Sequence, residues 1–172
     1  MATESPLSHT PSDLEVVTEL LGRPPMGSFT VVVRRDDGSP VVLANEPLLD
    51  NGTPMPTRFW LCDRVLNKAI GRVESEGAID HIERELPAEV IASTHAAYQA
   101  ERDARIPAAH VGPRPSGGVG GTRIGVKCLH AHYANLLVGN DDPIGEWTDR
   151  RLAEAGASFD ASEPGIVTTW PR

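Results

Sequence analysis

The apolar residues of this chain change from strand-like to helical spacing near Asp63, and that change limits the folds open to it. Residues 29–33 form a short β-branched run, residues 36–38 (Asp-Asp-Gly) are a typical hairpin turn, and residues 41–43 can return as a second strand. The aromatic segment 58–62 can add a third antiparallel strand, and from Asp63 onward the spacing is helical. We therefore predict an α+β fold, in which a small antiparallel sheet of about three strands packs against several helices in one domain.

Helical spacing and capping signals predict six helices. Ser12 with Glu15 three residues later has the spacing of a capping box, and Asp63 is a suitable N-cap for the helix after the third strand. The predicted helices cover residues 12–21, 63–76, 79–86, 88–105, 126–138 and 141–155. We expect a disordered lead-in at 1–11, a single domain at 12–155, and a tail at 156–172 in which residues 166–170 can dock as a strand.

Charge and composition exclude several classes of partner. Sixteen basic against 24 acidic residues give a net charge of −8, which opposes binding to nucleic acid and to anionic lipid. No apolar run approaches the roughly 18 residues of a membrane span, and the first residues lack the features of a secretion signal. With only two cysteines, the chain is not a disulfide scaffold, so we expect a cytoplasmic protein.

A long segment rich in proline and glycine, residues 106–125, is predicted to be a loop because neither residue suits regular structure at this density. A loop of this length in a compact domain is uncommon unless it is functional. It leads into a predicted helix N-terminus, where backbone N–H groups and basic side chains favour an anion such as phosphate or carboxylate. The predicted anion-binding residues are Gly117, Gly118, Gly120, Gly121, Arg123 and Lys127.

Cysteine and histidine are concentrated directly after this loop. If the helix begins at Val126, Cys128 and His132 lie one turn apart on one flank and His130 lies on the other flank. A thiol and an imidazole on one flank can share a zinc ion, and Cys62 at the end of the third strand can close the site. The predicted zinc ligands are therefore Cys62 and Cys128, with His130 or His132; a later helix start would also permit Cys128 and His130 together.

Three hypotheses about function follow from these residues. The first is a metal-binding protein, most simply with zinc. A thiol and an imidazole without a clear acid–base partner indicate metal ligands more directly than catalytic residues. The second is a cysteine-dependent hydrolase or transferase that acts on a small anionic molecule, with Cys128 as the nucleophile and His130 or His132 as proton acceptor. The third is an interaction protein without chemistry, in which the loop and the tail contact a partner. Without metal or reactivity, both cysteines would be small buried hydrophobic residues.

Several short motifs, in this order, resemble a known bacterial family. They are Gly-Arg-Pro-Pro at 22–25, Gly-Thr-Pro-Met-Pro-Thr-Arg-Phe-Trp-Leu-Cys at 52–62, Gly-Gly at 120–121, Val-Lys-Cys-Leu-His at 126–130 and Asp-Pro-Ile-Gly at 142–145. Together they resemble the domain of unknown function 501 family, which is widespread in actinobacteria. The resemblance implies a cytosolic bacterial protein and gives no activity. It retains Cys62, Cys128 and His130, but members often carry Cys-Pro-x-Gly in the first hairpin, where this chain has Arg-Asp-Asp-Gly at 35–38.

Overall fold

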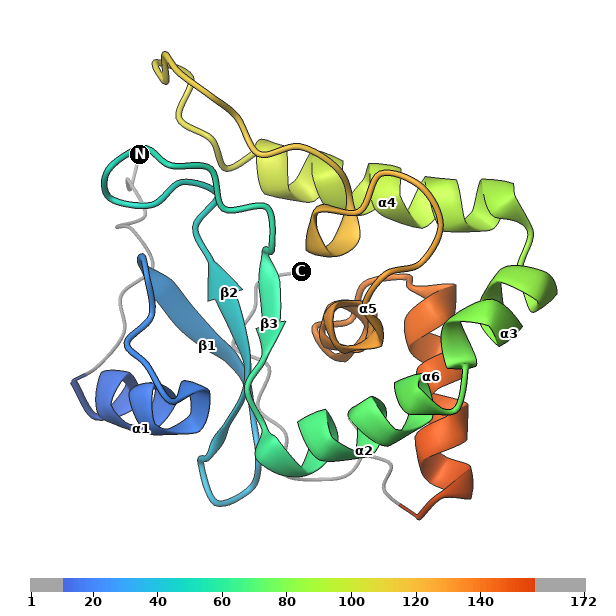
Figure 1. The fold of residues 1–172 in the computed structure, drawn as a ribbon. Helices are drawn as coiled ribbons and strands as arrows, with labels where there is room; N and C mark the ends of the chain where they lie inside the picture. The colour runs from blue at the N-terminus through green and yellow to red at the C-terminus, as the bar shows by residue number, and fades with distance from the viewer. Residues whose placement is uncertain (1–10, 157–172) are drawn as a thin grey trace.

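The sheet divides the molecule into two unequal parts. In the computed structural model, which describes residues 11–156, strands β1 (Phe29–Arg34), β2 (Pro40–Asn45) and β3 (Phe59–Leu61) form an antiparallel sheet in the order β1-β2-β3. Figure 1 shows α1 (Pro11–Leu21) on one side of this sheet and the remaining helices on the other. The predicted hairpin, third strand and α+β class are confirmed.

Five helices build the larger side, and each lies close to a predicted segment. They are α2 (Arg64–Ser75), α3 (Ala78–Glu85), α4 (Ala88–Asp103), α5 (Leu129–Leu137) and α6 (Pro143–Glu154). Asp63 caps α2 as predicted, since its side chain accepts the N–H of Leu66. Within the part of the chain that the structure describes, no helix combines the length and apolar character needed to cross a bilayer.

Strand alternation sends neighbouring side chains of β3 into two different cores. Phe59 and Leu61 are buried in the large cluster with residues of α2, α5 and α6, whereas Leu43 and Cys62 are buried in a smaller cluster with Val17 of α1. The polar group described below lies where α2 meets the N-terminal end of α5.

The start of α5 differs from the prediction. The helix begins at Leu129, and Cys128 is its N-cap residue with an extended backbone (φ −147°, ψ 110°). Gly125 has φ +68°, and the Val126 N–H donates to Glu83 Oε1 (2.8 Å). These tertiary contacts hold residues 125–128 out of the helix, although Val126 fits the apolar spacing of the helix that follows.

Three smaller outcomes complete the comparison with the predictions. Residues 106–125 form a loop, as predicted, and this loop contains one short 3₁₀ turn that was not predicted, η1 (Val119–Gly121). The first helix begins at Pro11 and not after Ser12, so the predicted capping box is not its start. The predicted strand at 166–170, and most of the predicted lead-in and tail, lie outside the described residues.

Candidate metal centre

Three potential metal ligands of different chemistry meet where α2 passes the beginning of α5. Glu74 comes from the last turn of α2, Cys128 from the N-cap of α5, and His130 from the first turn of α5. One donor atom from each side chain lies within 4.8 Å of the other two, and all three residues are partly buried. This group can hold a metal ion, because a carboxylate, a thiolate and an imidazole are all ligands for transition metals.

Two of the three distances within the group are close to those between ligands of a tetrahedral ion. His130 Nδ1 lies 3.8 Å from Cys128 Sγ and 3.3 Å from the nearer carboxylate oxygen of Glu74. Tetrahedral zinc with its usual bond lengths separates nitrogen and sulfur ligands by roughly 3.6 Å and nitrogen and oxygen ligands by roughly 3.3 Å. The two distances centred on His130 therefore need little adjustment to accept zinc.

The orientation of His130 is set by the backbone of α2. Its Nε2 lies 3.0 Å from the carbonyl oxygen of Asn67, and a carbonyl can only accept, so Nε2 carries the hydrogen. In the neutral ring, Nδ1 then holds the lone pair, directed at Cys128 and Glu74. A backbone carbonyl that fixes the tautomer in this way is a common outer partner of metal-binding histidines.

Glu74 also supports the helix that carries the other two residues. Its Oε1 accepts the backbone N–H of Leu129 (2.7 Å), one of the donors that a helix leaves free in its first turn. The negative charge is favourable there because of the helix dipole. Glu74 is thus fixed relative to α5, and the three donors form one unit held by two helices.

The ionisation of Cys128 and His130 is coupled. Burial opposes the charged form of Cys128, but the hydrogen bond with His130 and the Ala131 backbone N–H outweigh it and lower the pKa of the thiol below its usual value. Burial also opposes the charged form of His130, yet its contacts with Cys128, the Asn67 carbonyl and Glu74 raise its pKa to about 9. The geometry therefore favours thiolate at Cys128, the form in which cysteine binds metals or reacts.

A cavity of about 400 Å³ opens beside this group. Cys128 and His130 lie in its wall, opposite residues of β3, and Lys127 lines it while remaining exposed. The rest of the lining is largely apolar and comprises Thr57, Phe59, Trp60, Leu61, Asn67, Gly120 and Ala131. A molecule in this cavity would contact Cys128 and His130 directly.

Cys62 is not part of this group. It is 1% exposed in the smaller core next to α1, and burial raises the pKa of its thiol to about 12. The alternation along β3 explains the separation, because Cys62 points to the face opposite Phe59 and Leu61. Arg35 in the first hairpin pairs with Asp63 (2.5 Å). The predicted pairing of the two thiols is therefore not formed.

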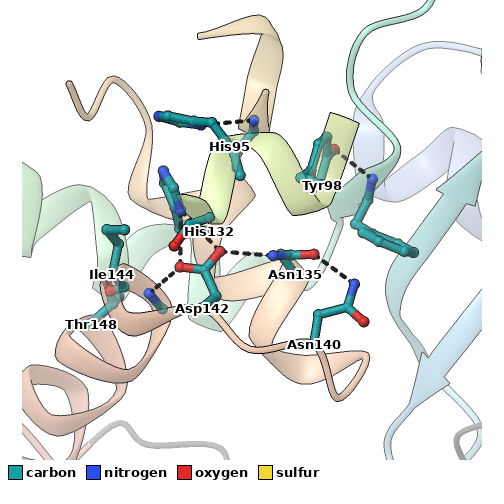
Figure 2. Close-up of polar contacts among 12 residues, drawn as sticks. His95, Tyr98, His132, Asn135, Asn140, Asp142, Ile144 and Thr148 are labelled. Atoms are coloured by element: carbon teal, nitrogen blue, oxygen red, sulfur yellow. Dashed lines mark hydrogen bonds and ion pairs between the residues drawn. The ribbon is translucent and has the colours of Figure 1, made fainter. Parts of the chain in front are cut away.

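His132 lies on the other flank of α5, in a buried polar cluster that also includes Asp142 and Asn135 (Figure 2). Its Nδ1 is 3.0 Å from both carboxylate oxygens of Asp142, which also accept hydrogen bonds from Asn135 Nδ2 (2.9 Å) and the Gly145 N–H (2.8 Å). The predicted pair of Cys128 and His132 is thus wrong: with the helix starting at Leu129, it is His130 that reaches the thiol.

Backbone N–H groups of the glycine-rich loop donate to acceptors within the protein. The N–H groups of Gly118 and Gly121 donate to Thr122 O (2.8 Å) and Gly118 O (3.0 Å), and the Val119 N–H donates to His95 Nδ1 (3.1 Å). The basic residues of the predicted anion site are also apart, since Arg123 lines a different cavity from Lys127. The structure therefore does not bring Gly117, Gly118, Gly120, Gly121, Arg123 and Lys127 together as one site.

Glu74 is the member of the group that sequence reasoning missed. It is one of several acidic residues on a predicted helix, and no local pattern distinguishes it from the others. Its proximity to Cys128, 54 positions later, results from the packing of α2 against α5.

Comparison with known proteins gives a family. Neither the curated proteins nor the solved structures contain a match to the chain. A sequence model of the family described as "protein of unknown function (DUF501)" matches residues 31–150, which include Glu74, Cys128 and His130. The match covers well over half of the sequence and agrees with the resemblance in its motifs. The chain belongs to the DUF501 family.

Proposed function

We propose that this protein binds one zinc ion through Glu74 Oε1, Cys128 Sγ and His130 Nδ1. The observation that carries the proposal is the convergence of these three donors within 4.8 Å, with the His130 tautomer already selected by Asn67. A mixed set of thiolate, imidazole and carboxylate suits zinc better than the hard cations magnesium and calcium, which prefer oxygen ligands.

Three protein ligands leave a fourth position for water or substrate. Structural zinc sites are normally closed by four protein ligands, whereas catalytic sites use three. In this proposal the open position faces the 400 Å³ cavity, whose wall includes Cys128 and His130. Zinc in such a site supplies a Lewis acid and an activated water, so the reaction class that fits best is metal-assisted hydrolysis.

The test is a zinc titration of metal-free protein against a chromophoric competing chelator. We expect one zinc per chain. Cys128→Ser, Glu74→Gln and His130→Asn should each weaken binding by more than about 100-fold, since losing an outer partner alone costs about 10–100-fold. Glu74→Gln retains an oxygen acceptor for the Leu129 N–H, so its effect reports on the ligand and not on the helix.

Two matched controls identify the site. Cys62→Ala removes the other cysteine, and His81→Asn removes an exposed histidine on α3. Both variants should bind zinc like the parent protein. Equal zinc affinity in Cys128→Ser and the parent, or no zinc binding by the parent, would show the proposal to be wrong.

A second candidate, a cysteine nucleophile, is supported by the placement of Cys128 itself. The thiol lies at the N-terminus of α5, 3.8 Å from a histidine that a third group, the Asn67 carbonyl, orients. Nucleophile, base and orienting group in this order can perform acyl transfer. In metal-free protein, iodoacetamide should then alkylate Cys128 at pH 7 at least about tenfold faster than in His130→Asn. Equal rates would exclude this candidate.

A further inference from the structure

We propose that the cavity beside the zinc site binds a small carboxylate with an apolar body, and that the carboxylate pairs with Lys127. This inference rests on the proposed function, because it takes this ligand to be the molecule on which the zinc ion acts. Three features of the structure support it: the lining of the cavity, the position of Lys127, and the charge of the whole group.

The volume and lining of the cavity favour a ligand whose uncharged part is small and apolar. Its volume, about 400 Å³, lies near the lower end of the roughly 300–1,000 Å³ typical of small-molecule sites. Phe59, Trp60, Leu61 and Ala131 contribute to its lining, together with a small number of polar residues that include Cys128 and His130. An aromatic ring or short aliphatic chain fits such a wall better than a sugar or a nucleotide.

Lys127 supplies a positive charge that can pair with the carboxylate of the ligand. The chain has only two lysines, Lys68 and Lys127, in a protein with eight more acidic than basic residues. The ammonium of Lys127 makes no hydrogen bond or ion pair with the residues that the structure describes, although it lines the cavity. A cation at the rim of an apolar cavity is a common arrangement for holding the charged end of a ligand.

The sum of charges favours a monoanion. Zinc with the carboxylate of Glu74, the thiolate of Cys128 and neutral His130 has a net charge of zero. Lys127 then makes the cavity region positive by one charge, which a carboxylate neutralises. A phosphate monoester, with close to two negative charges at neutral pH, would leave an excess negative charge in a partly desolvated site.

The experiment measures binding of a series of phenylalkanoates, from benzoate to 4-phenylbutyrate, and of their neutral amides and phosphate-ester analogues. Isothermal titration calorimetry is done on zinc-loaded protein whose zinc content is determined on the same sample. At least one carboxylate should bind about fivefold more tightly than its amide, the size expected of one partly exposed ion pair, and more tightly than its phosphate analogue.

Two lysine variants test whether Lys127 causes the preference for carboxylate over amide. Lys127→Gln should abolish the preference for carboxylate over amide, while Lys68→Gln, which removes an exposed lysine of α2, should retain it. Equal binding of acid and amide, tighter binding of the phosphate, a preference that survives Lys127→Gln, or no binding of any probe at millimolar concentration would overturn this inference. A sample with one zinc per chain and any of these results leaves the zinc proposal intact, whereas a parent protein without zinc contradicts the proposed function.

Discussion

Helix α5 carries two histidines, two residues apart, that lie in opposite kinds of polar environment. His132 is fully buried against Asp142, in a cluster whose carboxylate accepts hydrogen bonds from three different groups. His130 is about one-quarter exposed and lies beside a thiol, a carboxylate and a cavity. The difference teaches that a buried carboxylate satisfied by fixed donors stabilises the fold, whereas a carboxylate, a thiol and an imidazole that face one another beside a cavity can hold a metal ion.

The largest predicted effect is a loss of unfolding free energy when the buried cluster of His132, Asn135 and Asp142 is disrupted. Asp142→Ala removes the helix cap of α6 and leaves His132 and Asn135 without their acceptor, so the free energy of unfolding in urea should fall by about 3–5 kcal/mol. The zinc content of the folded fraction should not change. If Asp142→Ala does not fold, Asp142→Asn gives a milder comparison, and a loss below about 1 kcal/mol in both would contradict the role of this cluster.

The second largest effect is the stabilisation of the protein by zinc, which should depend on Cys128 and not on Asp142. Added at 100 times its dissociation constant to metal-free protein, zinc should raise the free energy of unfolding by about 2.7 kcal/mol. Asp142→Asn should show the same increase, and Cys128→Ser should show none. An increase in Cys128→Ser would mean that zinc stabilises the protein from another place.

Replacing each histidine by asparagine in metal-free protein compares the two positions directly. His132→Asn leaves Asp142 with one fewer buried donor and should cost about 1–3 kcal/mol of unfolding free energy. His130→Asn removes an imidazole whose pKa is raised to about 9, so its cost should fall below about 1 kcal/mol at pH 10, where the ring is neutral. A larger cost for His130→Asn than for His132→Asn, measured by urea denaturation at pH 10, would contradict the comparison.

The smallest effect is a pH dependence at His95, whose ring centroid lies 5.5 Å from that of His132. His95 accepts the Val119 N–H at Nδ1 and donates from Nε2 to Gly125 O, so it must be neutral. Burial and the neighbouring His132 lower the pKa of His95 below its usual value. A lowered histidine pKa contributes stability above the unfolded value of about 6.5, and this contribution is lost as the pH falls below it.

Metal-free His95→Gln should therefore lose less stability than the parent between pH 7 and pH 5. His81→Asn, at an exposed position on α3, should keep the slope of the parent. The measurement is urea unfolding at several pH values, and identical slopes in all three proteins would contradict the requirement for neutral His95.

The sheet and most helices were predictable because their signals are local. The Asp-Asp-Gly turn between β-branched runs predicted the β1–β2 hairpin, and Asp63 marked the start of α2. The start of α5 was not predictable in this way. Val126 has the right spacing to continue the helix, but its N–H is taken by Glu83, a residue 43 positions earlier, and no local pattern contains that contact.

The candidate site was predictable in part for the same reason. Cys128 and His130 are close in the sequence, and the structure brings them together. Cys62 was predicted as a ligand from its position at a strand end, but β3 alternates its side chains between the two cores and places Cys62 beside α1. Glu74 joins the group only through the packing of α2 on α5, which follows from the fold and not from a motif.

The central claim is the proposed coordination of zinc by Glu74, Cys128 and His130. X-ray absorption at the zinc edge of stoichiometrically loaded protein tests it directly. The prediction is one sulfur at about 2.3 Å together with nitrogen or oxygen ligands at about 2.0–2.2 Å, and loss of the sulfur contribution in Cys128→Ser but not in Cys62→Ala. A spectrum without sulfur, or one that only Cys62→Ala alters, would contradict the site described here.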